Sequence, residues 1–241
     1  RKAVLLTIPR QEIVDKLVKT INPSAKTLDS ITPYFNASPD HAKMAAASGV
    51  KPYTEAEATR LAAAKALLAK HGYSTANPLK LTLHWGGPTN ERRKNTAALM
   101  VAAAAKVGIE VVNKPSAVWS QELGQNKSDL QFFAWSQTST VFTGLRTIYG
   151  IADDGKPRNS NYIDWLNPTV DKALARHSDE ILDANGAFKV NQIFEKEYFK
   201  DAVGLPLFQW ASVIAASKTL KNVKPSALSP QVVWNFWEWK Y

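Results

Sequence analysis

The 241-residue chain contains no cysteine, which excludes a disulfide framework and any chemistry that needs a thiolate. It also has no apolar run near the roughly 20 residues that a membrane-spanning helix needs, because Lys and Glu interrupt the alanine-rich stretches. A mainly disordered chain is excluded as well, since 45% of the residues are hydrophobic and eight are tryptophan. The length suits one large domain or two small ones with a real hydrophobic core.

Acidic residues are scarce relative to basic ones, which gives the chain a net charge of +9. Such an excess can mark a nucleic-acid-binding protein. Here, however, the lysines are spread along the whole sequence, and the densest basic cluster is only Arg92-Arg93-Lys94. No helix-turn-helix, zinc-finger spacing or RNA-binding motif accompanies that cluster. We therefore expect a dispersed, solvated basic surface and no nucleic-acid partner.

Catalytic and metal-binding motifs are missing from the sequence. The histidines are scattered, without the His-x-x-x-His or His-Glu-x-x-His spacing that places two imidazoles on one helix face. There is no phosphate-binding glycine loop, dinucleotide fingerprint or complete Gly-x-Ser-x-Gly elbow. The sequence therefore predicts a protein that is not an enzyme and that has no metal site and no cofactor.

Residues 79–135 carry the clearest structural pattern. The leucines at alternate positions of 79–83 indicate a strand with one buried face, and Asn90 is a suitable N-cap for the helix that follows. Three predicted strands alternate with two predicted helices: strands at 79–83, 109–112 and 130–135, and helices at 90–105 and 119–123. Repeated β–α–β units of this spacing build a parallel sheet, so the expected fold class is α/β.

The carboxyl ends of the predicted strands define a candidate binding edge, because ligands of open α/β sheets bind beyond those ends. At the end of the third strand, an aromatic residue is followed by an uncharged polar run. We interpret Trp135 as a stacking platform and the side chains after it as hydrogen-bonding groups, namely Ser136, Gln137, Thr138 and Thr140. The alternatives are a core tryptophan at a strand end and an ordinary solvated loop.

The flanking segments carry weaker signals. Residues 1–20 are expected to form a helix bent at its proline, and residues 21–53 a long, irregular surface segment. A capping box at 54–57 predicts the start of the next helix, and Asn167-Pro168 predicts the start of another. A strand is expected from Leu205 to Ile214.

Both ends of the sequence are unusual. Residues 1–8 open directly in an apolar periodic segment, without an initiator Met or a leader. Near the other end lie four large aromatic residues that need a surface to pack against: Trp234, Phe236, Trp237 and Trp239. We therefore expect the chain to be a piece of a longer protein, with a tail that packs either on this chain or on a missing portion.

Eight segments occur in an order that covers nearly the whole chain: Arg10–Leu17, Tyr53–Tyr73, Leu79–Leu83, Lys106–Val111, Phe133–Trp135, Asn159–Tyr162, Asn167–Asp171 and Gly204–Phe208. Taken as a series, they resemble the carboxy-terminal lobe of the family-5 extracellular solute-binding proteins. These proteins are receptors for oligopeptides, dipeptides, nickel complexes and some sugars that feed ABC importers.

This resemblance implies a lobe of the type II periplasmic-binding-protein fold, with a mostly parallel sheet flanked by helices. Residues 1–228 would form the C-terminal lobe of a two-lobed protein whose N-terminal lobe is missing here, and residues 229–241 a tail that crosses back to it. The implied function is to bind a small organic solute or short peptide and deliver it to an ABC permease. The implied location is extracytoplasmic, as a cell-surface lipoprotein or in the periplasm. Four further ligand-binding residues follow from the resemblance: Asn161, Tyr162, Phe208 and Trp210.

One departure from the family pattern narrows the ligand. In peptide-binding members, an acidic residue shortly after the matching tryptophan holds the peptide's amino terminus, but no carboxylate follows Trp135. An unpaired buried charge costs several kcal/mol, so capture of a free amine is not expected at this point. A peptide held by its backbone, a blocked or neutral solute, and a sugar stay open. A nickel complex is less supported, because no His or Met cluster lies near this edge.

The alternative function is an extracytoplasmic sensor or interaction module that uses the same lobe without catalysis. A hydrolase would require a nucleophile and a base in the cleft, and these residues do not provide them.

Overall fold

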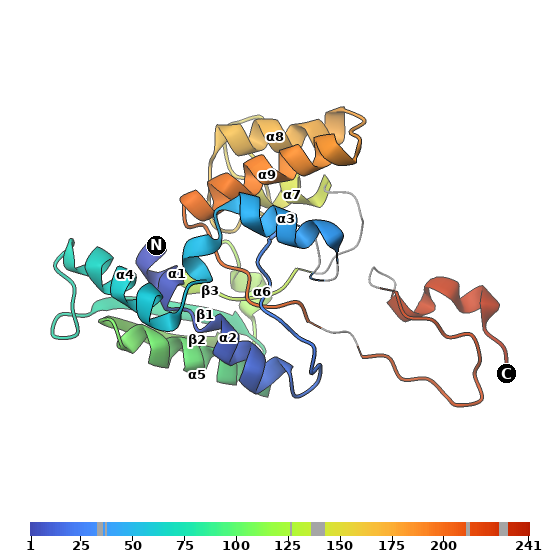
Figure 1. The fold of residues 1–241 in the computed structure, drawn as a ribbon, viewed down its shortest axis with the longest axis horizontal. Coiled ribbons are helices and arrows are strands. Elements are labelled where there is room, and N and C mark those ends of the chain that lie inside the picture. Colours follow the sequence, from blue (N-terminus) through green and yellow to red (C-terminus); the bar gives the residue numbers. More distant parts are fainter. Residues whose placement is uncertain (33–35, 37, 126, 136–142, 211–212, 227–230) are drawn as a thin grey trace.

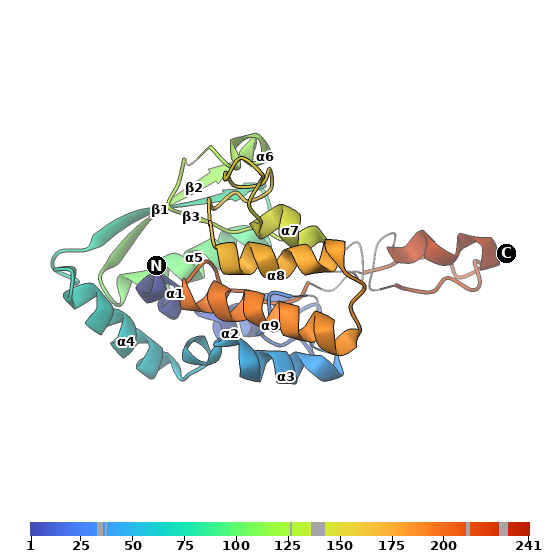
Figure 2. The same cartoon turned by 90° about the horizontal axis from the view of Figure 1, so that it is seen from above.

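The structure is a computed structural model that describes residues 1–32, 36, 38–125, 127–135, 143–210, 213–226 and 231–241 (Figures 1 and 2). It contains a three-stranded sheet of β1 (Leu79–Gly86), β2 (Ile109–Ser116) and β3 (Leu130–Gln131), in the order β2-β1-β3. Both strand pairs are parallel. The predicted α/β fold with a parallel sheet is confirmed.

Helices pack around this sheet. After β1 comes α5 (Glu91–Ala105), which lies below the sheet in Figure 1, and α6 (Trp119–Glu122) lies in the connection from β2 to β3. At the left of the same view, α1 (Lys2–Thr7) packs against α4 (Glu57–Ala69). The predicted bend at the proline is present, because α1 ends before it and α2 (Arg10–Ile13) begins after it, continuing as the π-helical turn η1 (Val14–Val18).

A second helical layer lies above the sheet in Figure 1. It consists of α3 (Pro39–Ser48), α7 (Thr143–Tyr149), α8 (Pro168–Asp179) and α9 (Ala184–Lys200). Both views show α8 and α9 side by side. The predicted cap of α8 is confirmed, because Asn167 Oδ1 accepts a hydrogen bond from the Val170 amide at 3.1 Å. Within the described part of the chain, no helix has the length and apolarity to cross a bilayer.

Three expectations for the flanking segments are wrong. The segment 21–53, expected to be irregular, contains α3 and the 3-10 turn η2 (Lys51–Tyr53). The capping box at 54–57 does not form, because the Thr54 hydroxyl donates to the Lys51 carbonyl and α4 has no side-chain cap. The described residues of 205–214 form no strand, and their only ladder contact is an isolated bridge between Thr27 and Phe208.

The connection from α5 to β2 depends on one glycine. Gly108 has a φ of +91°, in the left-handed region that favours glycine. A Cβ atom at this position would lie 2.3 Å from the backbone carbonyl carbon of Ser74. No side chain fits there without displacing the backbone, so Gly108 sets the approach of β2 to the sheet.

Arg10 is a buried residue that ties distant segments together. Its Nη1 donates to the Asp29 carboxylate at 2.8 Å. Three backbone carbonyls accept further bonds from the same guanidinium: Leu28 at 2.8 Å, Pro206 at 3.2 Å and Tyr53 at 3.2 Å. Burial lowers the pKa of Arg10, and the charge of Asp29 opposes that effect. Arg10 thereby fixes the start of the segment 205–210 to the body of the protein.

Residues 213–226 and 231–241 form a small unit at the right of Figure 1, which we call the C-terminal unit. It contains the 3-10 segment η3 (Gln231–Glu238), and Lys221 pairs with Lys240 in an antiparallel bridge. Asn235 is fully buried, and its amide donates to the Asn222 carbonyl at 2.7 Å. Phe236 and Trp237 are 63% and 66% exposed, so the described residues leave these aromatic side chains largely uncovered.

Glu195 on α9 is fully buried beside the segment that follows Asp29. One carboxylate oxygen, Oε1, accepts bonds from the Thr32 amide and from the hydroxyls of Ser30 and Thr32. The other oxygen, Oε2, has no hydrogen-bond partner among the described residues. Burial raises the pKa of Glu195, and the hydrogen bonds from Ser30 and Thr32 oppose the rise.

A raised pKa makes the stability of the folded state depend on pH in a defined direction. Because the folded protein holds the Glu195 proton more tightly than the unfolded chain does, this stabilisation is complete below the unfolded pKa of about 4.3. It is lost as the pH rises through the raised folded pKa. We therefore expect Glu195→Gln, which cannot ionise, to gain stability relative to the wild type between about pH 4 and pH 8. Urea denaturation across this range measures the effect.

Glu55→Gln is the matched control, because Glu55 is exposed. Its stability should follow the wild-type pH profile. Identical pH profiles for Glu195→Gln and the wild type would contradict the assignment.

Candidate ligand-binding edge

Trp135 and Tyr162 come together at the carboxyl end of the sheet. Trp135 follows β3 and is 45% exposed. Its ring stacks on the ring of Tyr162, with centroids 6.0 Å apart and planes only 7° from parallel. Two predicted ligand-binding residues from distant parts of the sequence are therefore in direct contact.

Two further aromatic residues extend this stack. The Phe133 ring meets the Trp135 ring edge-on at 5.3 Å, and the Trp119 ring of α6 lies 5.5 Å from Phe133. We call Trp119, Phe133, Trp135 and Tyr162 the aromatic row. Each such pair contributes roughly 0.5–1.5 kcal/mol beyond its buried area, so the row is a preformed surface. Trp119 and Phe133 are not among the site residues predicted from the sequence, although α6 also starts from the carboxyl end of a strand.

Phe208 and Trp210 lie against an arginine at the start of α5. The guanidinium carbon of Arg92 is 4.2 Å from the Trp210 ring centroid and 5.7 Å from that of Phe208. These distances are typical of cation–π contacts. Trp210 is 42% exposed, so this group, which we call the cation–aromatic cluster, also presents a ring at the surface.

Positive charge collects at the same end of β1. Arg93 Nη1 donates to the carbonyl of Gly86, the last residue of that strand, at 2.6 Å. Burial and the like charge of Arg93 lower the pKa of Arg92. Neither arginine forms an ion pair with a carboxylate in the part of the chain that the structure describes. The start of α5 adds the partial positive charge of a helix N-terminus, so the edge suits an anionic group.

Asn161 occupies a different environment from the other predicted site residues. It is only 3% exposed, and its amide donates to the Trp165 carbonyl at 2.9 Å and to the Gly150 carbonyl at 3.4 Å. Its oxygen accepts from the Trp165 amide at 3.3 Å. These bonds favour a structural role, in which Asn161 holds the loop that presents Tyr162.

The polar run after Trp135 lies outside the described residues. The hydrogen-bonding role of Ser136, Gln137, Thr138 and Thr140 therefore stays a prediction. Among the residues that are described, no group of three His, Asp or Glu side chains could hold a metal ion.

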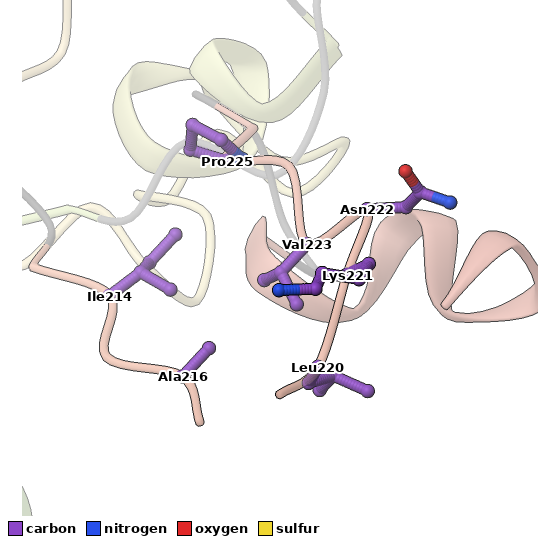
Figure 3. A pocket seen from close by; sticks show the side chains of 7 residues that line it. All are labelled: Ile214, Ala216, Leu220, Lys221, Asn222, Val223 and Pro225. Carbon is purple, nitrogen blue, oxygen red and sulfur yellow. The ribbon is translucent and has the colours of Figure 1, made fainter. Parts of the chain in front are cut away.

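A separate hollow of about 600 Å³ lies in the C-terminal unit. Its lining is mostly aliphatic, with Ile214 and Ala216 on one side and Leu220 and Val223 on the other (Figure 3). The Asn222 side chain turns away from the hollow and donates to the Glu238 carbonyl at 2.9 Å. Because this hollow brings together few polar groups, the strand ends remain the better candidate for the recognition of an organic solute.

The structural role of Asn161 is testable by truncation. Asn161→Ala leaves the Trp165 carbonyl and amide without their side-chain partner, whereas the Gly150 carbonyl still accepts from the Arg158 amide at 3.1 Å. The substitution should lower the free energy of unfolding by roughly 1–3 kcal/mol. Asn159→Ala is the matched control, because Asn159 is exposed, and it should have little effect. Urea denaturation of both variants measures the difference. Equal stability of the two variants would contradict the structural role of Asn161.

The relatives of known structure share this fold. The chain superimposes on Haemophilus influenzae OppA in complex with the peptide RPPGFSPFR, with a TM-score of 0.69 and 23% identity over 96% of this chain and 42% of that one. A periplasmic EDTA-binding protein, EppA, gives a TM-score of 0.78 at 15% identity, over 99% of this chain and 44% of that one. NikZ from Campylobacter jejuni, in complex with Ni(L-His), gives 0.69 at 17% identity, over 100% and 48%.

This chain thus spans less than half the length of these structures. A comparison with curated proteins finds no match. The profile of the bacterial extracellular solute-binding proteins, family 5 (middle region), matches residues 1–155. Together with the type II binding-protein fold of the structural relatives, this match shows that the chain belongs to the family-5 bacterial extracellular solute-binding proteins.

Proposed function

We propose that this chain is one lobe of a two-lobed receptor that captures an organic solute and delivers it to an ABC permease. Its half of the binding site is the edge formed by the aromatic row and the cation–aromatic cluster. The observation that carries the proposal is the stack of Trp135 on Tyr162 at the carboxyl end of a parallel sheet. Family membership supports binding and delivery in general terms.

The mechanism follows from the one-sided character of this edge. Trp135 and Trp210 each present a ring to solvent, and a ligand resting on them would keep its opposite face exposed. A second lobe closing over that face would bury it, so the ligand binds the closed state more tightly and shifts the population toward it. More than half the length of the related structures lies outside this chain, which is enough for such a lobe.

The charges at the edge favour a ligand that carries a carboxylate. Arg92 and Arg93 bring two positive charges without a carboxylate partner among the described residues, and the sequence after Trp135 supplies no negative charge for an amine. A peptide with a free C-terminus and a blocked N-terminus fits both conditions, and so does an organic acid. Two of the related structures name ligands with carboxyl groups, a peptide and EDTA.

An extracytoplasmic location agrees with the family's description as extracellular. Attachment to the cell surface through a lipid anchor is part of the same proposal.

The ligand class is tested by titration of a polypeptide that carries both lobes. We expect N-acetylated peptides with a free C-terminus to shift tryptophan emission and to bind more tightly than their C-terminal amides. Arg92→Ala should weaken binding of the free acids by about 10- to 100-fold more than binding of the amides, the range of a lost charge-assisted hydrogen bond.

Arg176→Ala is the matched control, because Arg176 is on α8 and pairs with Glu180. It should leave both peptide series unchanged. Equal loss of acids and amides in Arg92→Ala would overturn the carboxylate preference. The absence of binding by any peptide or organic acid would overturn the receptor proposal.

The C-terminal unit completes the proposal. Its exposed aromatic residues Trp234, Phe236 and Trp237 would otherwise form a sticky surface. In the two-lobed receptor, this surface packs against the other lobe, as the sequence predicts for residues 229–241.

This packing predicts that Phe236→Ala acts differently in the two contexts. It should lower the melting temperature of a two-lobed polypeptide, because burying a large aromatic side chain is worth roughly 1.5–3 kcal/mol. It should leave the isolated 241-residue chain nearly unchanged, since Phe236 is exposed there. Thermal melts of both forms measure the contrast, and an equal shift in both would contradict the packing.

A further inference from the structure

One face of β1 contacts the segment that connects β2 to β3, residues 117–129, which we call the crossover. The odd-numbered residues Leu83 and Trp85 are buried with Ala97 of α5, so the even-numbered residues face the other way. Three contacts join the even face to the crossover: Thr82 with Asp129, His84 with Glu122, and Gly86 with Trp119. The crossover is therefore anchored at three alternate positions of a single strand, 82, 84 and 86.

The Trp119 ring packs against Gly86. A Cβ atom at position 86 would lie 3.0–3.1 Å from three atoms of Trp119, which is closer than packed carbon atoms approach. The ring thus rests directly on the backbone of β1. It begins the aromatic row at this point.

The helix that carries Trp119 is not stable by itself. Only four residues long, α6 has no side-chain N-cap and no buried residue. Isolated helices of this length do not persist in water. Its position must come from contacts outside the helix, namely the packing of Trp119 on Gly86 and the contact of Glu122 with the buried His84.

The contact of Glu122 with His84 has a defined geometry. The imidazole is 6% exposed, and its Nε2 lies 3.0 Å from Glu122 Oε2. The other ring nitrogen, Nδ1, is buried without a partner among the described residues. A proton on Nδ1 would lack an acceptor, so the neutral ring carries its hydrogen on Nε2 and donates it to the carboxylate.

We propose that Glu122 is a positioning residue: by accepting the His84 hydrogen bond, it fixes α6 and so sets the orientation of the aromatic row. The Trp119 ring contacts Phe133, and Phe133 contacts Trp135, so the position of α6 affects the orientation of all three rings. Lys127 Nζ lies 3.5 Å from the other carboxylate oxygen of Glu122, Oε1, and forms an ion pair with it on the solvent side. The consequence for ligand affinity rests on the proposed function, whereas the orientation of the rings does not.

Fluorine NMR of the 5-fluorotryptophan-labelled chain tests the proposal without a ligand. We expect Glu122→Ala to shift or broaden the Trp119 and Trp135 resonances, assigned by Trp→Phe substitutions. The Trp165 resonance should stay in place, because that ring is buried among Tyr149, Phe194 and Tyr198. Glu122→Gln should restore the wild-type spectrum, since its amide oxygen still accepts the His84 bond.

Glu110→Ala is the matched control, because it removes an exposed glutamate that pairs with Lys80 on the same sheet. It should leave all tryptophan resonances unchanged. An unchanged Trp119 resonance in Glu122→Ala, or a lower melting temperature with an unchanged spectrum, would overturn the positioning role.

If Glu122→Ala does not fold, Glu122→Asp decides the question. It keeps the charge and withdraws the carboxylate by one methylene, so the Trp119 resonance should shift, and an unchanged resonance would overturn the proposal. The ligand titrations above can fail independently of this spectrum. Failure of the receptor proposal and failure of the positioning role are therefore distinguishable.

Discussion

The bonds of the buried Arg10 guanidinium are the interaction on which the remaining architecture depends. The guanidinium donates hydrogen bonds to backbone carbonyls of three separate segments and to one carboxylate. Removing it would leave several buried polar groups without a partner. Its planar fork suits this task, because one group reaches several acceptors at once. Through the bond to Pro206, it directs the chain toward Phe208 and Trp210. A residue far from the edge in sequence thereby helps to place the cation–aromatic cluster.

The candidate site combines three kinds of support. The sheet supplies the strand ends, the crossover supplies Trp119, and buried polar side chains hold the loops that carry the remaining rings. Asn161 illustrates the last kind, because its amide is used by the backbone of the loop that presents Tyr162. In the proposed receptor, recognition and packing are thus assigned to different residues, with the exposed rings assigned to recognition.

The sequence predicted the central part of the fold well because its signals there are local. Alternating leucines, the Asn90 cap and the Asn167-Pro168 start each act within a few residues, and the structure has all three elements. The failure at residues 205–214 involves long-range contacts. Residues 205–210 look like a strand in isolation, but their partners are Arg10, Thr27 and Arg92 rather than a sheet. Likewise, sequence could nominate Trp135 and Tyr162 separately, but only the fold shows that they stack.

Both faces of β1 make specific contacts, one with α5 and the other with the crossover, and these contacts constrain its register with β2 and β3. Moving the strand by one residue would turn Leu83 and Trp85 toward the crossover and His84 toward the apolar side of α5. Gly86 would no longer lie beneath Trp119, and a shift in one of the two directions would place the bulky Trp85 there. Slipped pairings are therefore penalised on both faces at once. The register of the β2-β1-β3 ladder and the position of the Trp119 ring are therefore coupled.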